Sequence, residues 1–410
     1  MSTVKKQKKL TKQKVLLLEN INSDAVKTFE DAGYQVVTHA KALSEQELIA
    51  AIPGVALLGI RSKTKVTQAV ISAAPQLRAI GAFCIGTNQI DIPTCTAKGI
   101  AVFNAPYSNT RSVVELAIGE IIMLMRRTFS QSIEAHAGGW DKSSKGSYEI
   151  RGKKLGIIGY GNIGSQLSVV AEGLGMQVAF FDIQEKLALG NARKMKTQKE
   201  LLAWADVVTL HVDGRVENAD LIDAPELKSM KKGAYLLNLS RGHVVVVDAL
   251  AAALRSGALA GASVDVFPHE PKGNDERFLS PLQGIPNVIL TPHVGGSTEE
   301  AQLAIGQYVS AKLVSFCTTG DSMLSVNFPQ TNMPQQEKTA RLVHIHANVP
   351  GMLAQINEVL AERKINVVGQ SLRTNEKVGY AVVDFVGKCT PELLADLSNI
   401  KGTIRVIHCN

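Results

Sequence analysis

Three side chains in the second half of the chain have the chemistry needed to oxidise a 2-hydroxy acid: Arg241, Glu270 and His293. The imidazole of His293 titrates near neutral pH and can take the proton of a hydroxyl group. The carboxylate of Glu270 can orient that ring and favour its protonated form, and the planar guanidinium of Arg241 can bind a substrate carboxylate. A histidine after proline, or an arginine before glycine, is by itself more often structural, so the prediction depends on the combination.

A glycine-rich turn predicts the cofactor, and its sequence is Gly159-Tyr-Gly161-Asn162-Ile163-Gly164. This pattern alone is a weak signal, but here it follows an apolar strand and begins a helix, as in dinucleotide-binding folds. The glycines permit a tight turn, the approach of a pyrophosphate and close helix packing, and the helix N-terminus supplies N–H donors. Asp182 ends the next predicted strand, where it can accept hydrogen bonds from ribose hydroxyls and would repel a 2′-phosphate. We therefore expect NAD; the alternative is that Asp182 is only a turn residue.

Short apolar runs that alternate with helical patterns predict two parallel sheets flanked by helices. In the first unit we expect a helix that begins at a capping box of Ser44 and Glu47, and strands at 15–18, 35–38, 55–60, 78–83 and 100–103. In the second we expect a long buried helix at 112–135, and strands at 155–159, 177–181, 207–210, 234–239, 262–266 and 288–290. Further candidate cofactor residues lie at the ends of strands of this second unit or after them: Leu239, Ser240, Asp265, Gly295 and Gly296. Because ligands bind at the carboxyl ends of parallel strands, these residues and the three above should line one crevice.

The last seventy residues predict a ferredoxin-like β-α-β-β-α-β sandwich, with strands at 341–347, 366–372, 380–386 and 403–408 and helices at 350–363 and 391–398. The polar stretch before it contains two prolines and has the composition of a linker. The predicted organisation is a basic tail (1–14), a discontinuous substrate-binding domain (15–109 and 297–328), an NAD-binding domain (110–296), the linker (329–339) and a regulatory domain (340–410).

The composition argues against several classes of protein. The 44 basic and 37 acidic residues give a formal net charge of +7, but six lysines fall in the first 14 residues, so we expect no nucleic-acid-binding face. The most apolar helical stretch, 113–125, is too short to span a membrane and contains two glutamates. The five cysteines are widely spaced without a C-x-x-C pair, which argues against a disulfide framework or a zinc site and fits a reducing cytoplasm.

The chain resembles the D-3-phosphoglycerate dehydrogenases, the members of the D-isomer-specific 2-hydroxyacid dehydrogenase family that carry a C-terminal ACT domain. The resemblance covers nearly everything after the basic tail, and its motifs are the glycine turn with Asp182, Ser240-Arg241-Gly242, Val264-Asp265-Val-Phe-Pro-His-Glu270-Pro271 and Thr291-Pro-His293-Val-Gly-Gly-Ser-Thr298. It implies oxidation of D-3-phosphoglycerate to 3-phosphohydroxypyruvate with NAD, the first step of L-serine synthesis. It also implies that His293 is the acid/base, Glu270 its partner and Arg241 a substrate ligand, that Asp265 lies near the nicotinamide amide, and that the protein is a homotetramer.

A second cluster bears on the substrate, because the hydride-transfer motifs are shared by dehydrogenases of several 2-hydroxy acids. Arg61-Ser62-Lys63-Thr64 follows a predicted strand and groups two cations with two hydroxyls, which suits a dianion such as a phosphate. The alternative is a solvated charged turn. The resemblance favours Arg61 and Ser62 as substrate residues, with three weaker candidates, Asn109, Lys142 and Gln302.

The predicted regulatory domain has candidate effector residues. His346 and Asn348 at a strand-to-helix turn, and Asn366 before the next strand, resemble the ACT positions that bind serine across a subunit interface. Asparagine amides can pair with the carboxylate and ammonium of an amino acid, although such residues also serve as ordinary turn formers. Val349 stands where an arginine is common, and the linker lacks a Gly-Gly pair, so strong serine inhibition is in question. His344 and His346 share a strand face without a third ligand, so we expect no metal site.

Three other hypotheses stay open from the sequence. One is a dehydrogenase for an unphosphorylated or dicarboxylic acid, and reduction of 2-oxoglutarate is also expected as a side activity. Another is an NAD sensor or corepressor that has kept the fold without the reaction. A third is a module that only senses amino acids, which the small share of the ACT-like part disfavours.

Overall fold

The apolar runs of the first hundred residues form a five-stranded parallel sheet in the order β2-β1-β3-β4-β5. Its strands are β1 (Lys14–Leu17), β2 (Gln35–Thr38), β3 (Val55–Ile60), β4 (Ala79–Ala82) and β5 (Ala101–Phe103). One face packs against α1 (Ser23–Asp31) and α11 (Glu299–Thr319), and the other against α2 (Glu45–Ala51), α3 (Gln68–Ser72) and α4 (Ile92–Ala97). All six residues of β3 are buried, which is why its sequence is apolar without alternation.

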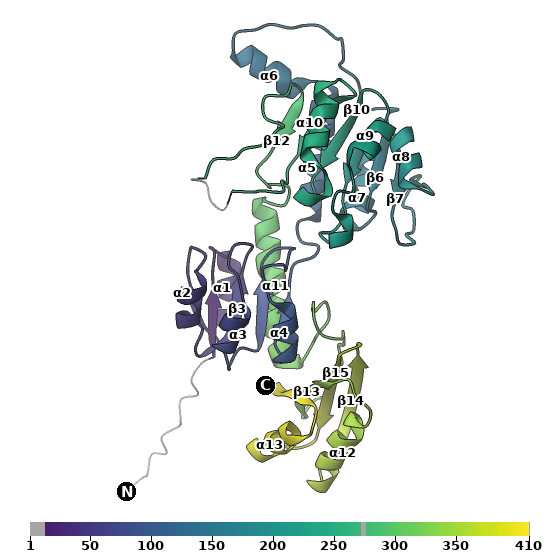
Figure 1. Ribbon diagram of the computed structural model, residues 1–410. Helices are drawn as coiled ribbons and strands as arrows, with labels where there is room; N and C mark the ends of the chain where they lie inside the picture. The colour runs from purple at the N-terminus through teal and green to yellow at the C-terminus, as the bar shows by residue number, and fades with distance from the viewer. Residues whose placement is uncertain (1–12, 272–275, 410) are drawn as a thin grey trace. The chain divides into compact units, whose positions relative to one another are not determined.

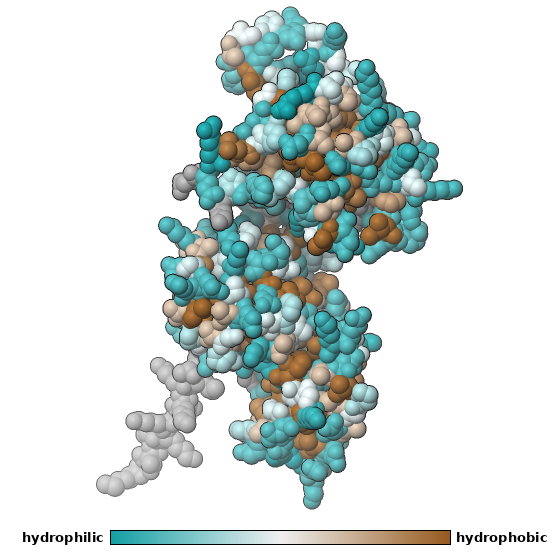
Figure 2. Space-filling model, in the orientation of Figure 1, coloured by the Kyte–Doolittle hydropathy of each residue, from teal (hydrophilic) through white to brown (hydrophobic). Residues whose placement is uncertain are grey.

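The computed structural model describes residues 13–271 and 276–409. The chain divides into two units, Met1–Pro106 with Gln302–Asn410 and Tyr107–Ala301 (Figure 1). On the face drawn in Figure 2 the surface is mostly hydrophilic, with scattered hydrophobic residues. Within the described ranges no helix is long and apolar enough to cross a membrane.

The second unit contains a seven-stranded parallel sheet in the order β12-β11-β10-β9-β6-β7-β8. Its strands are β6 (Lys154–Ile158), β7 (Gln177–Phe181), β8 (Arg193–Lys194), β9 (Val207–Leu210), β10 (Ala234–Asn238), β11 (Leu259–Val264) and β12 (Val288–Leu290). One face packs against α5 (Thr110–Met125) and α7 (Asn162–Gly173), and the other against α8 (Gln198–Trp204), α9 (Ala224–Ser229) and α10 (Val247–Arg255). Short 3-10 turns lie at Val216–Asn218 and Gly242–Val244, and α6 (Thr128–His136) follows α5.

The C-terminal part of the first unit is an antiparallel sheet in the order β14-β15-β13-β16. Its elements in chain order are β13 (Ala340–Ala347), α12 (Met352–Glu362), β14 (Val367–Thr374), β15 (Val378–Phe385), α13 (Pro391–Asn399) and β16 (Thr403–Cys409). The two helices pack on one face of this sheet. Residues of the other face, among them Val343 and Tyr380, belong to the same hydrophobic core as the five-stranded sheet.

The predicted fold class is confirmed: two parallel α/β sheets and a β-α-β-β-α-β sandwich. The capping box of Ser44 and Glu47 is also present. The single helix predicted at 112–135 is wrong, because Arg127 adopts a left-handed backbone conformation (φ 56°) that separates α5 from α6. Of the predicted basic tail, residues 1–12 lie outside the described residues. The domain limits drawn from the sequence stay predictions.

Candidate active site

The glycine turn joins β6 to α7. Its backbone has the tight turn, the open surface and the close helix packing that were expected from its three glycines. Gly159 has φ 90°, and a Cβ there would lie 2.5 Å from the carbonyl oxygen of His211. A Cβ on Gly164 would lie 2.2 Å from the carbonyl oxygen of Gly159, so the helix can approach the strand only without a side chain. At Gly161, by contrast, no atom lies within 4 Å of the added Cβ, and no side chain caps the helix N-terminus. This open backbone surface with free N–H donors fits the pyrophosphate of a dinucleotide.

Asp182 lies directly after β7, and its carboxylate is fixed by two backbone amides. Tyr160 N–H donates to Oδ2 and Gln184 N–H to Oδ1, each at 2.8 Å. The remaining lone pairs can accept hydrogen bonds from ribose hydroxyls. Sequence reasoning missed Arg215, whose pKa is raised mainly by its hydrogen bond to Asp213 and also by the charge of Asp182. Its guanidinium is hydrogen-bonded to Asp213 (Nε to Oδ1 2.7 Å), and the prediction that Asp182 disfavours a 2′-phosphate stays a prediction.

His293 and Glu270, which the sequence predicts to be an acid/base pair, lie within hydrogen-bonding distance of each other. The ring nitrogen Nδ1 of His293 lies 2.9 Å from Oε2 and 3.1 Å from Oε1 of Glu270. The hydrogen bond to Glu270 is the largest effect that raises the pKa of His293; burial and the charge of Arg241 oppose it. Burial alone would raise the pKa of Glu270, but the hydrogen bonds from His293 and from the Phe267 amide lower it, together with the charges of His293 and Arg241. The pair is therefore a carboxylate beside an imidazole that binds its proton more readily than usual.

The loop that carries His293 is held by the buried carboxylate of Asp265. Its Oδ1 accepts hydrogen bonds from Thr291 Oγ1 (2.6 Å) and Val294 N–H (2.8 Å), and its Oδ2 accepts one from Gly295 N–H (2.8 Å). The backbone N–H of His293 donates to the carbonyl oxygen of Asp265 at 2.8 Å. Asp265 is 1% exposed, and its carboxylate holds this loop in place through these hydrogen bonds. The expectation that it also lies near the nicotinamide amide stays a prediction.

Arg241 follows β10 in a turn that is fixed on both sides. The buried Asn238, which sequence reasoning did not single out, donates from Nδ2 to the carbonyl oxygen of Arg241 (3.0 Å) and accepts from Ser240 N–H (3.1 Å). A Cβ on Gly242 would lie 2.0 Å from the backbone of Phe267, so glycine lets this turn contact the segment that leads to Glu270. Because Arg241 lowers the pKa of both His293 and Glu270, the structure brings the three predicted residues together.

Most of the other predicted residues of this unit lie in or next to the loops that carry Arg241 and His293, and Lys142 lies elsewhere. Leu239 and Ser240 are buried after β10. A Cβ on Gly296 would lie 2.1 Å from Nδ2 of Asn109, whose Oδ1 has no hydrogen-bond partner in the described part of the chain. Lys142 is exposed in the segment after α6. Arg61, Ser62 and Gln302 belong to the first unit, so the structure does not place them relative to the catalytic residues.

The predicted effector residues do not form one cluster in a single chain. His346 is 2% exposed, and its Nδ1 lies 2.8 Å from the carbonyl oxygen of Ala347. Asn348 follows β13 and donates to the carbonyl oxygen of Asn375, whereas Asn366 is exposed before β14. The register pairs Ala347 with one end of β15 and Val367 with the other end. Asn348 and Asn366 therefore lie at opposite ends of the sheet. Among the described residues no group of three or more potential metal ligands is present.

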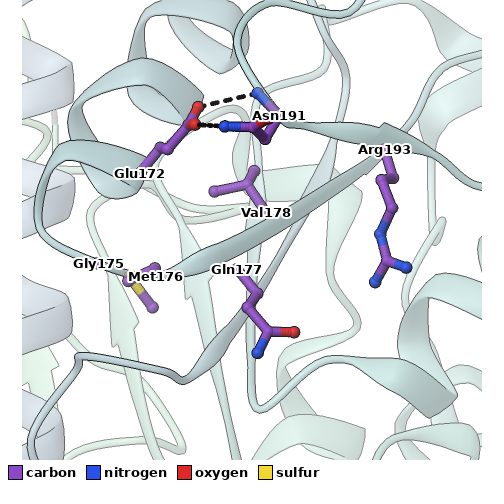
Figure 3. A pocket seen from close by; sticks show the side chains of 7 residues that line it. All are labelled: Glu172, Gly175, Met176, Gln177, Val178, Asn191 and Arg193. Atoms are coloured by element: carbon purple, nitrogen blue, oxygen red, sulfur yellow. Dashed lines mark hydrogen bonds between the residues drawn. The ribbon is translucent and has the colours of Figure 1, made fainter.

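A cavity of about 330 Å³ lies elsewhere on the second unit and contains none of the predicted residues. Its lining residues come from the end of α7, the start of β7 and the segment into β8: Glu172, Gly175, Met176, Gln177, Val178, Asn191 and Arg193 (Figure 3). Glu172 and Asn191 point toward one another there, with Asn191 N–H donating to Glu172 Oε2 at 3.0 Å. Because it opens at the amino end of β7, it lies away from the glycine turn and Asp182.

The fold and the site define an NAD-linked dehydrogenase of 2-hydroxy acids. Residues 118–295 match the family model of the D-isomer specific 2-hydroxyacid dehydrogenase NAD binding domain, and residues 342–405 match that of the AHAS small subunit-like ACT domain. The D-3-phosphoglycerate dehydrogenase of Haemophilus influenzae is 50% identical over 396 residues, which cover 96% of this chain and 97% of the relative. The D-3-phosphoglycerate dehydrogenase of Escherichia coli (strain K12) is 46% identical over 397 residues, with 96% and 97% covered.

A solved structure supports the same class. The D-lactate dehydrogenase of Aquifex aeolicus, complexed with NAD and lactic acid, aligns with a TM-score of 0.64 at 26% identity and covers 74% of this chain and 95% of that one. The chain belongs to the D-3-phosphoglycerate dehydrogenases, within the D-isomer-specific 2-hydroxyacid dehydrogenase family.

Proposed function

We propose that the protein catalyses the NAD-dependent interconversion of D-3-phosphoglycerate and 3-phosphohydroxypyruvate, the entry step of L-serine synthesis. The observation that carries this proposal is the pair of His293 and Glu270 at 2.9 Å, with Arg241 close enough to change both pKa values, in the unit that holds the glycine turn. The choice of substrate rests on the relatives, which are named as D-3-phosphoglycerate dehydrogenases, because the hydride-transfer residues alone would suit many 2-hydroxy acids.

The residues of the chain have separate tasks in this reaction. The glycine turn and Asp182 would hold NAD, which would supply the acceptor for the hydride on C2 of the hydroxy acid. Because Glu270 engages Nδ1 of His293, the hydroxyl proton goes to Nε2 of the ring, and the carboxylate stabilises the imidazolium that forms. Arg241 binds the substrate carboxylate and polarises the C2 oxygen. In the reverse direction His293 must begin protonated, which its raised pKa favours near neutral pH.

Turnover of NADH with 3-phosphohydroxypyruvate tests the proposal, with 2-oxoglutarate as the competing substrate. We expect a higher kcat/KM for the phosphorylated acid and slower reduction of 2-oxoglutarate. His293→Ala should lower kcat by about 10²–10⁴-fold, the usual contribution of a general acid/base, while NADH still binds. Binding of NADH by the unchanged protein without turnover of any 2-hydroxy acid would instead support the sensor hypothesis.

We also propose that two copies of the ACT-like domain share a serine site. Since Asn348 and Asn366 lie at opposite ends of one sheet, a two-fold pairing of sheets is the arrangement that brings one amide from each chain to a common ligand. Serine added to the turnover assay tests this, and Asn348→Ala should weaken any inhibition. Val349, which replaces a common arginine, predicts weak inhibition.

Homotetramer formation is proposed on the family resemblance and on an exposed apolar surface. Three large apolar side chains of α6 and the segment after it, Phe129, Ile133 and Trp140, are exposed, Trp140 by 81%. Surfaces of this kind mark interfaces between chains. Light scattering measures the mass directly, and Trp140→Glu should reduce it. A cytoplasmic location is proposed because the five cysteines are widely spaced and include no C-x-x-C pair.

A further inference from the structure

The five-stranded sheet of the first unit has its topological switch point between β1 and β3. The strand order β2-β1-β3-β4-β5 reverses direction there, and in open α/β sheets ligands bind beyond the carboxyl ends of the two strands at such a point. The segments beyond those ends are Glu19-Asn20 after β1 and the cluster Arg61-Ser62-Lys63-Thr64 after β3. The backbone joins them, since Leu18 N–H donates to the carbonyl oxygen of Gly59 at 2.9 Å.

The carboxylate of Glu19 accepts hydrogen bonds from three of the four backbone amides of this cluster. Oε1 accepts from Arg61 N–H (3.1 Å) and Thr64 N–H (2.8 Å), and Oε2 accepts from Lys63 N–H (3.0 Å). Glu19 is 8% exposed, so these bonds are largely shielded from water. Converging backbone amides in a turn form an anion-binding concavity, and here an internal carboxylate fills it.

The chain accepts an unusual backbone conformation to place this carboxylate. Glu19 has φ 63° and Asn20 φ 53°, two consecutive non-glycine residues in the left-handed region. Such conformations persist only where surrounding interactions over-determine them, and they cluster at binding sites. The cluster is also held from its other side, because Gln89 Nε2 donates to the carbonyl oxygen of Arg61 at 2.7 Å.

In the described part of the chain, the two basic side chains of the cluster are not paired with carboxylates. Arg61 is half-buried, and Ser62 and Lys63 are exposed. In the ranges that the structure describes, neither Arg61 nor Lys63 forms an ion pair. The carboxylate of Glu19 is therefore hydrogen-bonded to backbone amides and does not pair with Arg61 or Lys63. Both cations remain available to bind an external anion.

We infer that Glu19 is a positioning residue for the phosphate of the substrate. By filling the backbone concavity, it excludes the phosphate from the amides of Arg61, Lys63 and Thr64 and fixes the turn from which the cations project. Recognition of a phosphate monoester dianion then depends on the side chains of Arg61 and Lys63. This inference rests on the proposed function. It adds that the specificity for the phosphorylated acid depends in part on Glu19, a residue that does not contact the substrate.

Steady-state kinetics of Glu19→Gln and Lys63→Ala test the inference. The glutamine keeps the size of the side chain but replaces one acceptor by a donor that faces a donating amide. We expect KM for 3-phosphohydroxypyruvate to rise about tenfold, the effect of losing one hydrogen bond to a charged group. KM for NADH and kcat should stay within about twofold, since the site of hydride transfer is unchanged. Lys63→Ala, on an exposed side chain, should raise the same KM without affecting the backbone contacts.

Amide hydrogen exchange supplies a readout that does not depend on activity. In Glu19→Gln the amides of Arg61, Lys63 and Thr64 should exchange faster than in the unchanged protein, whereas in Lys63→Ala they should not. Asp321→Asn is the matched control, because Asp321 is another buried carboxylate of the same unit that accepts a backbone amide, from Met323 at 2.8 Å. We expect this control to leave KM for the phosphorylated substrate unchanged.

The outcomes separate the inference from the proposed function. If the unchanged protein does not reduce 3-phosphohydroxypyruvate, the proposed function fails. If it does, but Glu19→Gln or Lys63→Ala leaves KM unchanged, the inference is overturned. It is also overturned if Asp321→Asn raises KM equally, or if Glu19→Gln lowers kcat and raises KM for NADH to the same extent, since a general loosening would then explain the result.

Discussion

His293 adopts a left-handed backbone conformation (φ 56°), which is uncommon for a residue other than glycine. The hydrogen bonds from His293 N–H and the Val294 and Gly295 amides to Asp265 maintain it. Strain of this kind is found where surrounding contacts hold a functional side chain in place. The ring therefore meets Glu270 in a geometry that the backbone sets in advance, and the pKa of the ring depends on that geometry.

Glu270→Gln should move the pH profile of the reaction in a direction that the pair predicts. Glu270 raises the pKa of His293, first through its hydrogen bond and then through its charge, so a neutral amide lets that pKa fall. Oxidation of the hydroxy acid needs the neutral ring as base, so the acid limb of kcat/KM should shift to lower pH. Reduction needs the protonated ring, so its alkaline limb should shift to lower pH as well.

Steady-state rates between pH 5 and 9 in both directions measure these shifts. Asp248→Asn, an exposed acid in the first turn of α10, is the control and should leave both profiles unchanged. A limb that stays in place or moves to higher pH in Glu270→Gln would show that another group sets the pKa of His293.

Asp182→Asn should reduce the discrimination between NADH and NADPH. The amide keeps a side-chain oxygen for one of the two backbone N–H groups that hold Asp182, but it removes the negative charge that repels a 2′-phosphate. The ratio of kcat/KM for NADH to that for NADPH should fall about tenfold, which corresponds to about 1.4 kcal/mol. An unchanged ratio would assign the cofactor preference to other residues.

The sequence predicts those site residues whose proposed roles follow from local patterns. The glycine turn, Asp182 and the trio each occupy a recognisable position at a strand end. Asn238 and Glu19 were missed, because their partners are backbone groups that only the folded chain brings to them. Asp213 and Arg215 pair through their side chains and were missed because two opposite charges in a loop form no motif that indicates a cofactor site. A signal was present in Asn238, a polar residue at the end of an apolar strand, but it did not say what the side chain would bind.

At the scale of elements, α5 carries a carboxyl group that the reaction does not use. Glu120 is fully buried on this helix, and neither of its oxygens has a hydrogen-bond partner among the described residues. Burial raises its pKa to about 7, the nearby Ser263 opposes this shift and the charge of Asp265 adds to it. Ionised Glu120 therefore destabilises the packing of α5 on the sheet.

Glu120→Gln should stabilise the protein at alkaline pH and not at acidic pH. The folded state keeps this proton up to about pH 7, whereas the unfolded chain releases it near the ordinary glutamate pKa of 4.5. The free energy of unfolding thus falls as the pH rises from about 4.5 to about 7, by up to about 3 kcal/mol at 1.36 kcal/mol per pKa unit. The neutral amide removes this loss. Urea unfolding at pH 5 and pH 8 measures the difference.

Glu115→Gln is the control on the same helix, because the side chain of Glu115 is exposed and pairs with Arg111. Its effect should be small at both pH values. If Glu120→Gln changes stability equally at pH 5 and pH 8, the folded and unfolded chains release this proton at the same pH, and burial does not raise the pKa of Glu120.

Element prediction succeeded where the pattern is long and apolar and failed where one residue breaks it. The parallel strands were predicted because burial on both faces leaves continuous apolar runs. The break between α5 and α6 was not predicted, since Arg127 is an ordinary helix former whose left-handed conformation is set by the fold. The short edge strand β8, only Arg193–Lys194, has no apolar pattern that would reveal it.

At the scale of the whole chain, a buried arginine connects the ACT-like sheet to the rest of its unit. Arg341 forms a two-point ion pair with Asp384, Nε to Oδ1 at 2.6 Å and Nη2 to Oδ2 at 2.7 Å, and both side chains are 1% exposed. Its Nη1 also donates to the carbonyl oxygen of Thr319 at the end of α11 (2.9 Å) and to that of Met333 (2.7 Å). The predicted linker is therefore held through its backbone, although its composition suggested a loose connection.

Arg341→Met should destabilise this unit by about 3–5 kcal/mol, because it leaves Asp384 buried without a partner. The Arg341→Met, Asp384→Leu double variant removes both charges and should recover most of that loss, since apolar replacements of a buried pair are often tolerated. In both variants the carbonyl groups of Thr319 and Met333 lose their donor. Only in the single variant is Asp384 also left buried without a partner, so there the ACT-like sheet should unfold in a separate transition at lower temperature. Calorimetry of the two variants and the unchanged protein measures this. A single transition at an unchanged temperature in Arg341→Met would mean that the shared hydrophobic core, and not the ion pair, holds the two sheets together.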